Sequence, residues 1–122
     1  GSQLMLENVY EHGPGEMLEL FARLRPAGAG LCLDCGHLTA FGRAPLDEWL
    51  EVLGPFIGQL HLHDNLGQKD DHLPMGRGRV DFRRLFAYLK DQRTAPPVMT
   101  MEVHRPADVW ASLECLEGLW PW

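Results

Sequence analysis

Four residues that can bind a divalent metal ion each stand at the far end of a short apolar run: Glu7, Asp34, His61 and Glu102. Asp34 follows Glu7 by 27 residues, and His61 follows Asp34 by the same interval. The recurrence predicts successive strand–helix units that each deliver one ligand to the same rim. Because carboxylates suit hard cations and an imidazole tolerates borderline ones, the set predicts a single site for Mn²⁺, Mg²⁺, Co²⁺ or Zn²⁺.

The chain around these residues alternates between strand-like and helix-like segments. Strands are predicted over residues 4–9, 29–37 (with the exit loop), 59–64 and 98–103, and helices over 16–25, 46–53, 81–92 and 107–119. Strands that alternate with helices of about 10–15 residues indicate βα units and a parallel sheet.

The side-chain pattern of the third predicted strand separates two kinds of α/β fold. Leu60 and Leu62 face one way, while Gln59, His61 and His63 face the other. An open doubly wound sheet is apolar on both faces, whereas a barrel has helices outside and polar residues at its mouth. A full barrel needs about 200 residues or more. We therefore predict an α/β fold in which four βα units form half of a TIM (β/α)8 barrel, with helices on the outer face of parallel strands.

The length of 122 residues is enough for one domain with a hydrophobic core. Residues 1–2 resemble the remnant of a cleaved tag, so residues 3–122 are predicted to form a single half-barrel domain. Because a four-stranded half barrel exposes its inner face and two sheet edges, we expect it to self-associate as a homodimer that completes the barrel.

Composition narrows the classes of function and the setting. Seventeen acidic and eleven basic residues give a net charge of −6, which disfavours non-specific binding of nucleic acid. No apolar run approaches the roughly 18 residues of a membrane span, and no signal-peptide pattern opens the chain. Cys32 and Cys35 flank Asp34 inside an apolar run, so we expect buried small residues and a reducing, cytoplasmic setting rather than a redox motif.

Four segments resemble the xylose isomerase-like TIM barrels: LENVYE (6–11), LDCGH (33–37), HLHDNLGQKDDHLPMGRGRVDF (61–82) and MEVH (101–104). That superfamily includes sugar-phosphate isomerases and epimerases and the endonuclease IV class of AP endonucleases. The resemblance covers essentially the whole chain and matches it to the second half of the barrel. Its most specific part is an H-x-x-D followed by D-x-H-x-x-x-G-x-G-x-x-D.

The resemblance implies a metal-dependent isomerase or epimerase of a sugar or sugar phosphate, which transfers a proton alpha to a carbonyl through an enediolate. It implies that the single metal of the ketose epimerase branch has four ligands here: Glu7, Asp34, His61 and Glu102. The resemblance also implies that Glu7 and Glu102 act as the catalytic acid/base pair, on opposite faces of the substrate.

The resemblance also singles out residues outside that set. His37 matches a residue that contacts substrate in epimerases and a metal in the nuclease branch. Asp70 and His72 match two further zinc ligands of the nuclease branch. His63 replaces what is often a lysine in the family, so it is either a polar residue of the barrel mouth or a substrate contact.

Arg77 belongs to the one basic cluster of the chain, which is either a solvated surface or a substrate-binding group. Two alternatives to an epimerase stay open. An endonuclease IV-like zinc phosphodiesterase would act on abasic DNA and would need a basic rim and two histidines from earlier strands. A non-catalytic half-barrel would only self-associate.

Overall fold

The computed structural model describes residues 2–24 and 27–122. In chain order the elements are β1 (Met5–Glu7), α1 (Pro14–Leu24), β2 (Gly30–Asp34), α2 (Cys35–Phe41), α3 (Leu46–Leu53), the 3-10 helix η2 (Gly54–Phe56), β3 (Ile57–Leu62), α4 (Phe82–Gln92), β4 (Val98–Met101) and α5 (Pro106–Leu119). All predicted strands and helices are present, although residue 25 of the first predicted helix lies outside the described residues. The sequence patterns missed α2 and η2.

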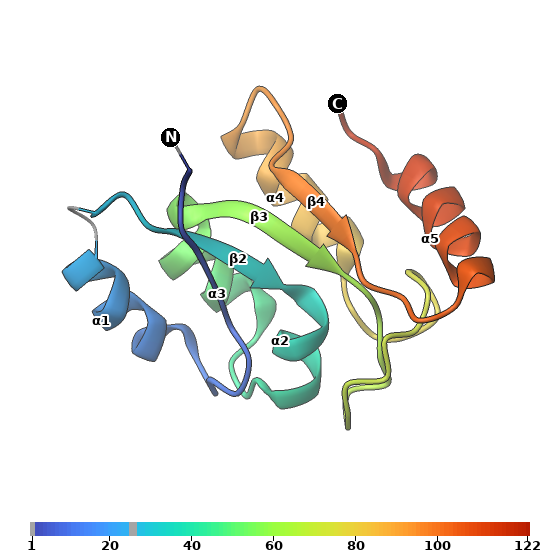
Figure 1. Cartoon of the computed structure of the whole chain (residues 1–122), viewed down its shortest axis with the longest axis horizontal. Helices are drawn as coiled ribbons and strands as arrows, with labels where there is room; N and C mark the ends of the chain where they lie inside the picture. The colour runs from blue at the N-terminus through green and yellow to red at the C-terminus, as the bar shows by residue number, and fades with distance from the viewer. Residues whose placement is uncertain (1, 25–26) are drawn as a thin grey trace.

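The four strands form one parallel sheet in the order β1-β2-β3-β4, as predicted for consecutive βα units. Figure 1 shows α3 and α4 behind this sheet, while the face toward the viewer carries no helix. The helices therefore cover one face, which corresponds to the outside of a barrel.

The strand register determines which side chains share a face. Asp34 pairs with His61, and His61 pairs with Thr100. Glu7 pairs with Cys32, two residues before Asp34, so both lie on the same face of the pleat. Glu102 follows Thr100 by two residues and joins them. The paired registers therefore place all four predicted ligands on the inner, helix-free face.

The apolar residues between these positions form the core under the helices. Leu33, Leu60 and Leu62 have at most 1% of their surface exposed and pack with Trp49 and Phe86 from the covering helices. The burial of these side chains fixes the strands through their outer face. The polar side chains of the inner face therefore do not need to pack for the strands to keep their positions.

A sharp turn joins β2 to α2 and depends on Asp34. The Asp34 carboxylate accepts a 2.7 Å hydrogen bond from the His37 backbone N–H and so caps the helix. The cap starts α2 directly after the strand and brings the His37 side chain back over the strand ends. The exit loop predicted for residues 35–37 is therefore the first turn of a helix.

The long loop after β3 is held by Asp64, whose side chain is fully buried. Its carboxylate accepts backbone N–H groups from Gly76, Gly78 and Val80 at 2.8–3.1 Å. Asp64 and Leu73 also exchange two backbone hydrogen bonds. The buried carboxylate therefore ties both the middle and the end of the loop to the strand.

The sheet is open at both edges and on its inner face among the described residues. Leu4 beside β1 is 59% exposed, and Val98 in β4 is 65% exposed. Neither outer strand has a second neighbour within residues 2–24 and 27–122. None of the helices in this part of the chain has the length and apolar character needed to cross a membrane.

Candidate metal centre

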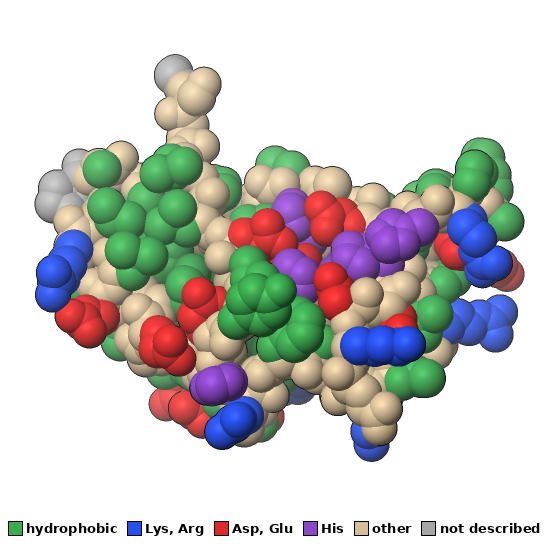
Figure 2. All heavy atoms as spheres, turned by 60° about the horizontal axis from the view of Figure 1, so that its bottom comes forward, with side chains coloured by type: hydrophobic (Ala, Val, Ile, Leu, Met, Phe, Trp, Pro, Cys, Tyr) green, Lys and Arg blue, Asp and Glu red, His purple; other side chains and the backbone are tan. Residues whose placement is uncertain are grey.

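The four predicted ligands converge at the carboxyl ends of the strands, and we call them the strand-end cluster: Glu7, Asp34, His61 and Glu102. One potential ligand atom from each lies within 4.8 Å of all the others. His61 Nδ1 is central, 3.2 Å from Glu7 Oε1, 3.1 Å from Glu102 Oε1 and 3.7 Å from Asp34 Oδ2. Figure 2 shows acidic and histidine side chains gathered in one patch at this rim.

The members of the strand-end cluster differ in exposure. The Asp34 side chain is fully buried, whereas the side chains of Glu7 and Glu102 are 34% and 31% exposed. The buried carboxylate can hold an ion from below, while the two glutamates at the outer strands remain accessible from the inner face.

Burial and mutual contact displace the pKa values of the carboxylates in opposite directions. Burial and the hydrogen bond with Asp34 raise the pKa of Glu7. Burial also acts to raise the pKa of Asp34, but the hydrogen bond and charge of His63 and the His37 backbone N–H outweigh it and lower that pKa. Asp34 is thus the carboxylate whose ionised form the protein stabilises most directly.

The second ring nitrogen of His61 lies 3.4 Å from the Gln59 side-chain amide, which also contacts the Thr100 hydroxyl at 3.1 Å. Which end of the amide carries the nitrogen and which carries the oxygen is assigned from such hydrogen-bond networks. With the oxygen of Gln59 toward His61, that oxygen accepts the Nε2 proton and leaves Nδ1 bare for a metal ion. Gln59 is therefore suited to orient the imidazole ligand.

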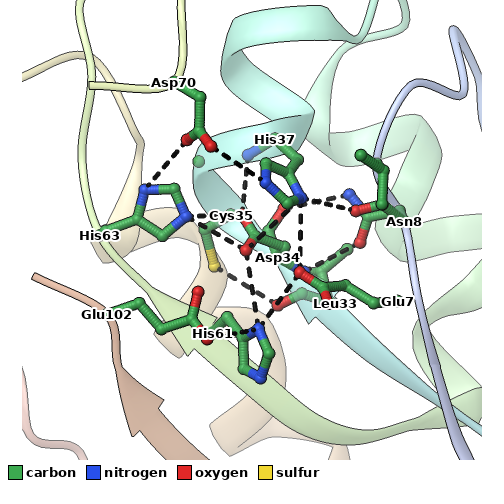
Figure 3. Close-up of polar contacts among 12 residues, drawn as sticks. Glu7, Asn8, Leu33, Asp34, Cys35, His37, His61, His63, Asp70 and Glu102 are labelled. Atoms are coloured by element: carbon green, nitrogen blue, oxygen red, sulfur yellow. Dashed lines mark hydrogen bonds and ion pairs between the residues drawn. The ribbon is translucent and has the colours of Figure 1, made fainter. Parts of the chain in front are cut away.

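A second group of potential ligands lies beside the first, and we call it the histidine cluster: His37, His63, Asp70 and His72. Its potential ligand atoms also lie within 4.8 Å of one another. His37 Nε2 and His72 Nε2 approach Asp70 Oδ2 at 3.3 and 3.0 Å. Figure 3 shows Asp70 above His37 and His63, with the strand-end cluster below them. The structure thus brings the predicted residues His37, Asp70 and His72 together and adds His63.

The sequence left two interpretations open for His63 and Arg77: a contact with substrate, or a barrel-mouth position for His63 and a solvated surface for Arg77. His63 has no exposed surface, and its Nε2 lies 2.9 Å from Asp34 Oδ1. Arg77 is exposed beside α5 and belongs to neither cluster. His63 therefore connects the two clusters instead of lining an accessible surface.

The sequence patterns gave no role to Asn8, which links β1 to the site. Its buried side chain accepts the Asp34 backbone N–H at 2.8 Å and donates to the Asp34 carbonyl at 3.1 Å. Its own carbonyl lies 2.9 Å from His37 Nδ1. Burial acts to lower the pKa of His37, but the charge of Asp34, this carbonyl and the charge of Asp70 together raise it.

Comparison with known proteins assigns the chain and its fold to one family. Residues 1–119 match the family described as the xylose isomerase-like TIM barrel. The chain belongs to the xylose isomerase-like TIM barrel family. The family predicted from the sequence motifs is therefore confirmed, and so is the predicted fold class of a half barrel.

Individual proteins are similar to this chain in sequence or in fold. The TTHB071 protein from Thermus thermophilus, solved after soaking with ZnCl2, is 31% identical with a TM-score of 0.75 over 96% of this chain. A D-tagatose 3-epimerase-like protein is 28% identical with a TM-score of 0.80, also over 96%. Protein MJ1311 of Methanocaldococcus jannaschii is 33% identical over 79 residues, 64% of this chain.

The chain corresponds to only part of these xylose isomerase-like relatives. It covers 44% of the TTHB071 chain and 46% of the epimerase-like chain. The aligned part spans 27% of the length of protein MJ1311. A complete barrel of the family is thus about twice as long as the four βα units described above.

Proposed function

We propose that this chain supplies the metal-binding and proton-transferring half of a sugar isomerase or epimerase. The observation that carries the proposal is the convergence of one ligand atom from each of Glu7, Asp34, His61 and Glu102 within 4.8 Å at the ends of the strands. The D-tagatose 3-epimerase-like protein supports a sugar substrate, and the TTHB071 protein supports a divalent ion.

The donor set of the strand-end cluster fits a divalent cation. Three carboxylates share the cluster with one imidazole, and no lysine or arginine among the described residues forms an ion pair with any of these carboxylates. Converging carboxylates repel one another unless a cation or a proton lies between them. Three oxygen donors and one nitrogen donor suit Mn²⁺, Mg²⁺, Co²⁺ or Zn²⁺.

The two glutamates supply the proton chemistry in this proposal. Glu7 and Glu102 approach His61 Nδ1 from opposite edges of the sheet, at 3.2 and 3.1 Å. One carboxylate takes the proton alpha to the substrate carbonyl, and the other delivers a proton to the opposite face. A bound divalent ion supplies Lewis-acid stabilisation of the negative charge that develops on the substrate oxygens.

Mn²⁺ titration of the purified chain tests the site, because the paramagnetic resonance signal reports the free ion. We expect one equivalent to bind, and Glu102→Gln to weaken binding at least about tenfold by removing one charged ligand. Glu51→Gln is the matched control, since Glu51 is exposed on α3 and away from the cluster. Absence of Mn²⁺ binding, or equal binding in both variants, would overturn the site.

Hydrogen exchange at carbon tests the chemistry. A ketose incubated with the chain and Mn²⁺ in D2O should gain deuterium at the carbon alpha to its carbonyl, as followed by NMR. Glu7→Gln should abolish this exchange, while Glu51→Gln should leave it unchanged. If the wild-type chain binds Mn²⁺ but catalyses no exchange, the site binds metal without the proposed activity.

We further propose that the open inner face is covered by a second copy of the chain. The exposed Leu4 and Val98 mark the two free edges of the sheet, and parallel edges are available for further pairing. Light scattering across a range of concentrations should give the mass of a dimer. A monomer mass at all concentrations would contradict this proposal without affecting the metal site.

The nuclease-like alternative has one observation in its favour, the presence of His37, Asp70 and His72 in a common cluster. The net charge of −6 opposes it, because phosphate binding depends on basic groups. Binding of abasic-site DNA that weakens as salt increases would favour the nuclease over the epimerase.

A further inference from the structure

Two aromatic side chains lie beside the strand-end cluster, and the sequence patterns gave a role to neither. The rings of Tyr10 and Phe41 pack against each other with their centroids 5.0 Å apart and their planes inclined at 54°. The Phe41 ring lies 5.9 Å from the ring of His37, whose Nδ1 is 3.4 Å from Glu7 Oε1. The two aromatic rings therefore extend outward from the edge of the strand-end cluster, and we call them the aromatic wall.

The aromatic wall presents apolar surface to solvent next to polar groups. Tyr10 is 72% exposed, and Phe41 is partly buried beneath it. Figure 2 shows hydrophobic side chains directly beside the patch of acidic and histidine side chains. Sites for small molecules combine aromatic side chains with a few convergent polar groups, which is the combination at this rim.

Hydrogen bonds hold the loop that carries Tyr10. Two residues before Tyr10, the buried Asn8 side chain makes two hydrogen bonds to the backbone at the end of β2. Two residues after it, the His12 carbonyl accepts the backbone N–H groups of Arg43 and Ala44 at 2.8 and 3.0 Å. The Tyr10 ring is therefore exposed on a loop that is fixed on both sides, and a preorganised group binds a ligand at a lower entropic cost.

The chemistry of an aromatic ring matches one part of a sugar. The hydroxyl groups of a sugar suit a metal ion and carboxylates, whereas its C–H groups form the apolar part of its surface. The face of an aromatic ring is electron-rich, so it attracts weakly positive C–H hydrogens as well as burying apolar area. The strand-end cluster and the aromatic wall together therefore match the polar and the apolar parts of one sugar.

The distances agree with a ligand that contacts both parts of the rim. A six-carbon sugar in its open-chain form is about 6 Å long, because each C–C bond is about 1.5 Å long. The rings of His37 and Phe41 are 5.9 Å apart, and His37 touches the strand-end cluster through Glu7. A sugar bound to the ion by its first carbons can thus reach the aromatic wall with its last ones.

We propose that the aromatic wall binds the carbons of the sugar beyond the two oxygens that the metal ion takes, and that it selects sugars with an apolar far end, such as 6-deoxy sugars. The inference rests on the proposed function, because the ion at the strand-end cluster holds the near end of the sugar. Tyr10 is then a specificity-determining residue. It contacts the sugar away from the carbon that exchanges its proton.

Binding of sugar alcohols to the Mn²⁺-loaded chain tests the aromatic wall without catalysis, because they offer hydroxyls to the ion and have no carbonyl to react. L-rhamnitol and L-mannitol differ only at one end, where a methyl replaces a hydroxymethyl group. We expect L-rhamnitol to bind about 3–10-fold more tightly, as measured by the broadening of its NMR lines by Mn²⁺.

Substitutions at Tyr10 should change this preference in a graded way. Tyr10→Ala should weaken the binding of L-rhamnitol by about tenfold and abolish the difference between the two sugar alcohols, whereas Tyr10→Phe should retain both. Trp110→Ala is the matched control, since Trp110 is an equally exposed aromatic residue (73%) on α5. It should leave the binding of both sugar alcohols unchanged.

Three results overturn the aromatic wall. One is that neither sugar alcohol binds to the Mn²⁺-loaded wild-type chain. Another is equal binding of L-rhamnitol by the wild-type chain and Tyr10→Ala. The third is a loss of Mn²⁺ affinity in Tyr10→Ala that accounts for its weaker binding of L-rhamnitol, because Tyr10 would then support the ion and not the sugar.

Kinetics separate failure of the aromatic wall from failure of the proposed function. With a 6-deoxyketose in D2O, Tyr10→Ala should raise KM for deuterium exchange about tenfold and leave kcat unchanged, as expected for a lost binding contact. An unchanged KM would overturn the aromatic wall while the exchange chemistry stands. A wild-type chain that binds L-rhamnitol through Tyr10 but catalyses no exchange would retain the wall and lose the proposed function.

Discussion

The strand-end cluster and the histidine cluster lie side by side, yet their residues come from different kinds of secondary structure. The strand-end ligands stand at or just after the ends of β1, β2, β3 and β4, on one face of a regular sheet. The histidine cluster comes from the first turn of α2, the residue after β3 and the following loop. The strands leave the glutamates at their ends about one-third exposed, whereas the loop places Asp70 and His72 over the helix start and the strand end.

The two clusters also differ in their donors, and Asp34 connects them. Three carboxylates dominate the strand-end cluster, and three imidazoles dominate the histidine cluster. The buried Asp34 carboxylate belongs to the first and accepts the hydrogen bond of His63 from the second. Variants at Asp34 should therefore affect both clusters, and variants elsewhere should separate them.

The largest effect is expected from Asp34→Asn, because it removes the shared charge. The amide can still cap α2, so folding should persist. We expect Mn²⁺ binding at the strand-end cluster to weaken by more than about 100-fold, as measured by calorimetric titration. Asp91→Asn, on the exposed end of α4, is the control, and unchanged Mn²⁺ affinity in Asp34→Asn would contradict the role of this carboxylate.

Gly36→Ala should separate the clusters by displacing His63. A Cβ at position 36 would lie 2.0 Å from the His63 ring. We expect a loss of about 1–3 kcal/mol in the free energy of unfolding from overpacking. Mn²⁺ binding at the strand-end cluster should weaken only through the displaced hydrogen bond between His63 and Asp34.

Gly118→Ala provides the comparison for chemical denaturation of Gly36→Ala. Position 118 lies in α5 and has no atom within 4 Å of an added Cβ. Alanine there should leave stability unchanged or raise it by about 0.5–1 kcal/mol. Equal stability of the two variants would show that His63 does not pack against position 36.

Asp64→Asn should loosen the histidine cluster through the loop. One Asp64 oxygen accepts the N–H groups of Gly76 and Gly78, and the other accepts those of Asn65 and Val80. Replacing one oxygen with an amide group leaves two buried donors without an acceptor, at a cost of about 1–3 kcal/mol. Trypsin should then cleave the loop faster, and cleavage at the wild-type rate would contradict this anchoring role.

The smallest effect is expected from Gln59→Leu, which removes the group that orients the imidazole of His61. We expect Mn²⁺ affinity at the strand-end cluster to decrease by about tenfold. Gln92→Leu, at the exposed end of α4, should leave Mn²⁺ affinity unchanged. Equal Mn²⁺ affinity in Gln59→Leu and the wild-type chain would contradict the orienting role of Gln59.

Much of the strand-end cluster could be predicted from the sequence because its information is local. Each ligand ends an apolar run, and the alternation around Leu60 and Leu62 separates the faces of the strand. Parallel strands place their carboxyl ends at one rim. The convergence of these four side chains followed from these patterns.

The histidine cluster could be predicted only in part, because its geometry depends on contacts between distant segments. The motif implied His37, Asp70 and His72 by resemblance, whereas His63 was left open between a polar residue of the barrel mouth and a substrate contact. Its burial comes from Gly36, whose missing side chain lets the ring pack against α2, and from the Asp34 carboxylate, which lies 29 residues away in the sequence. No local pattern signals such a pairing.

The sequence by itself determined the alternation of strands and helices, the polar inner face and the positions of the strand-end residues, because these depend on periodicity along short segments. Only the tertiary structure decided the role of Asn8 and Asp64, the position of His63 and the orientation of three imidazoles around Asp70. Those features arise where a strand end, a helix start and a long loop meet. Hydrogen bonds between segments far apart in the chain determine them.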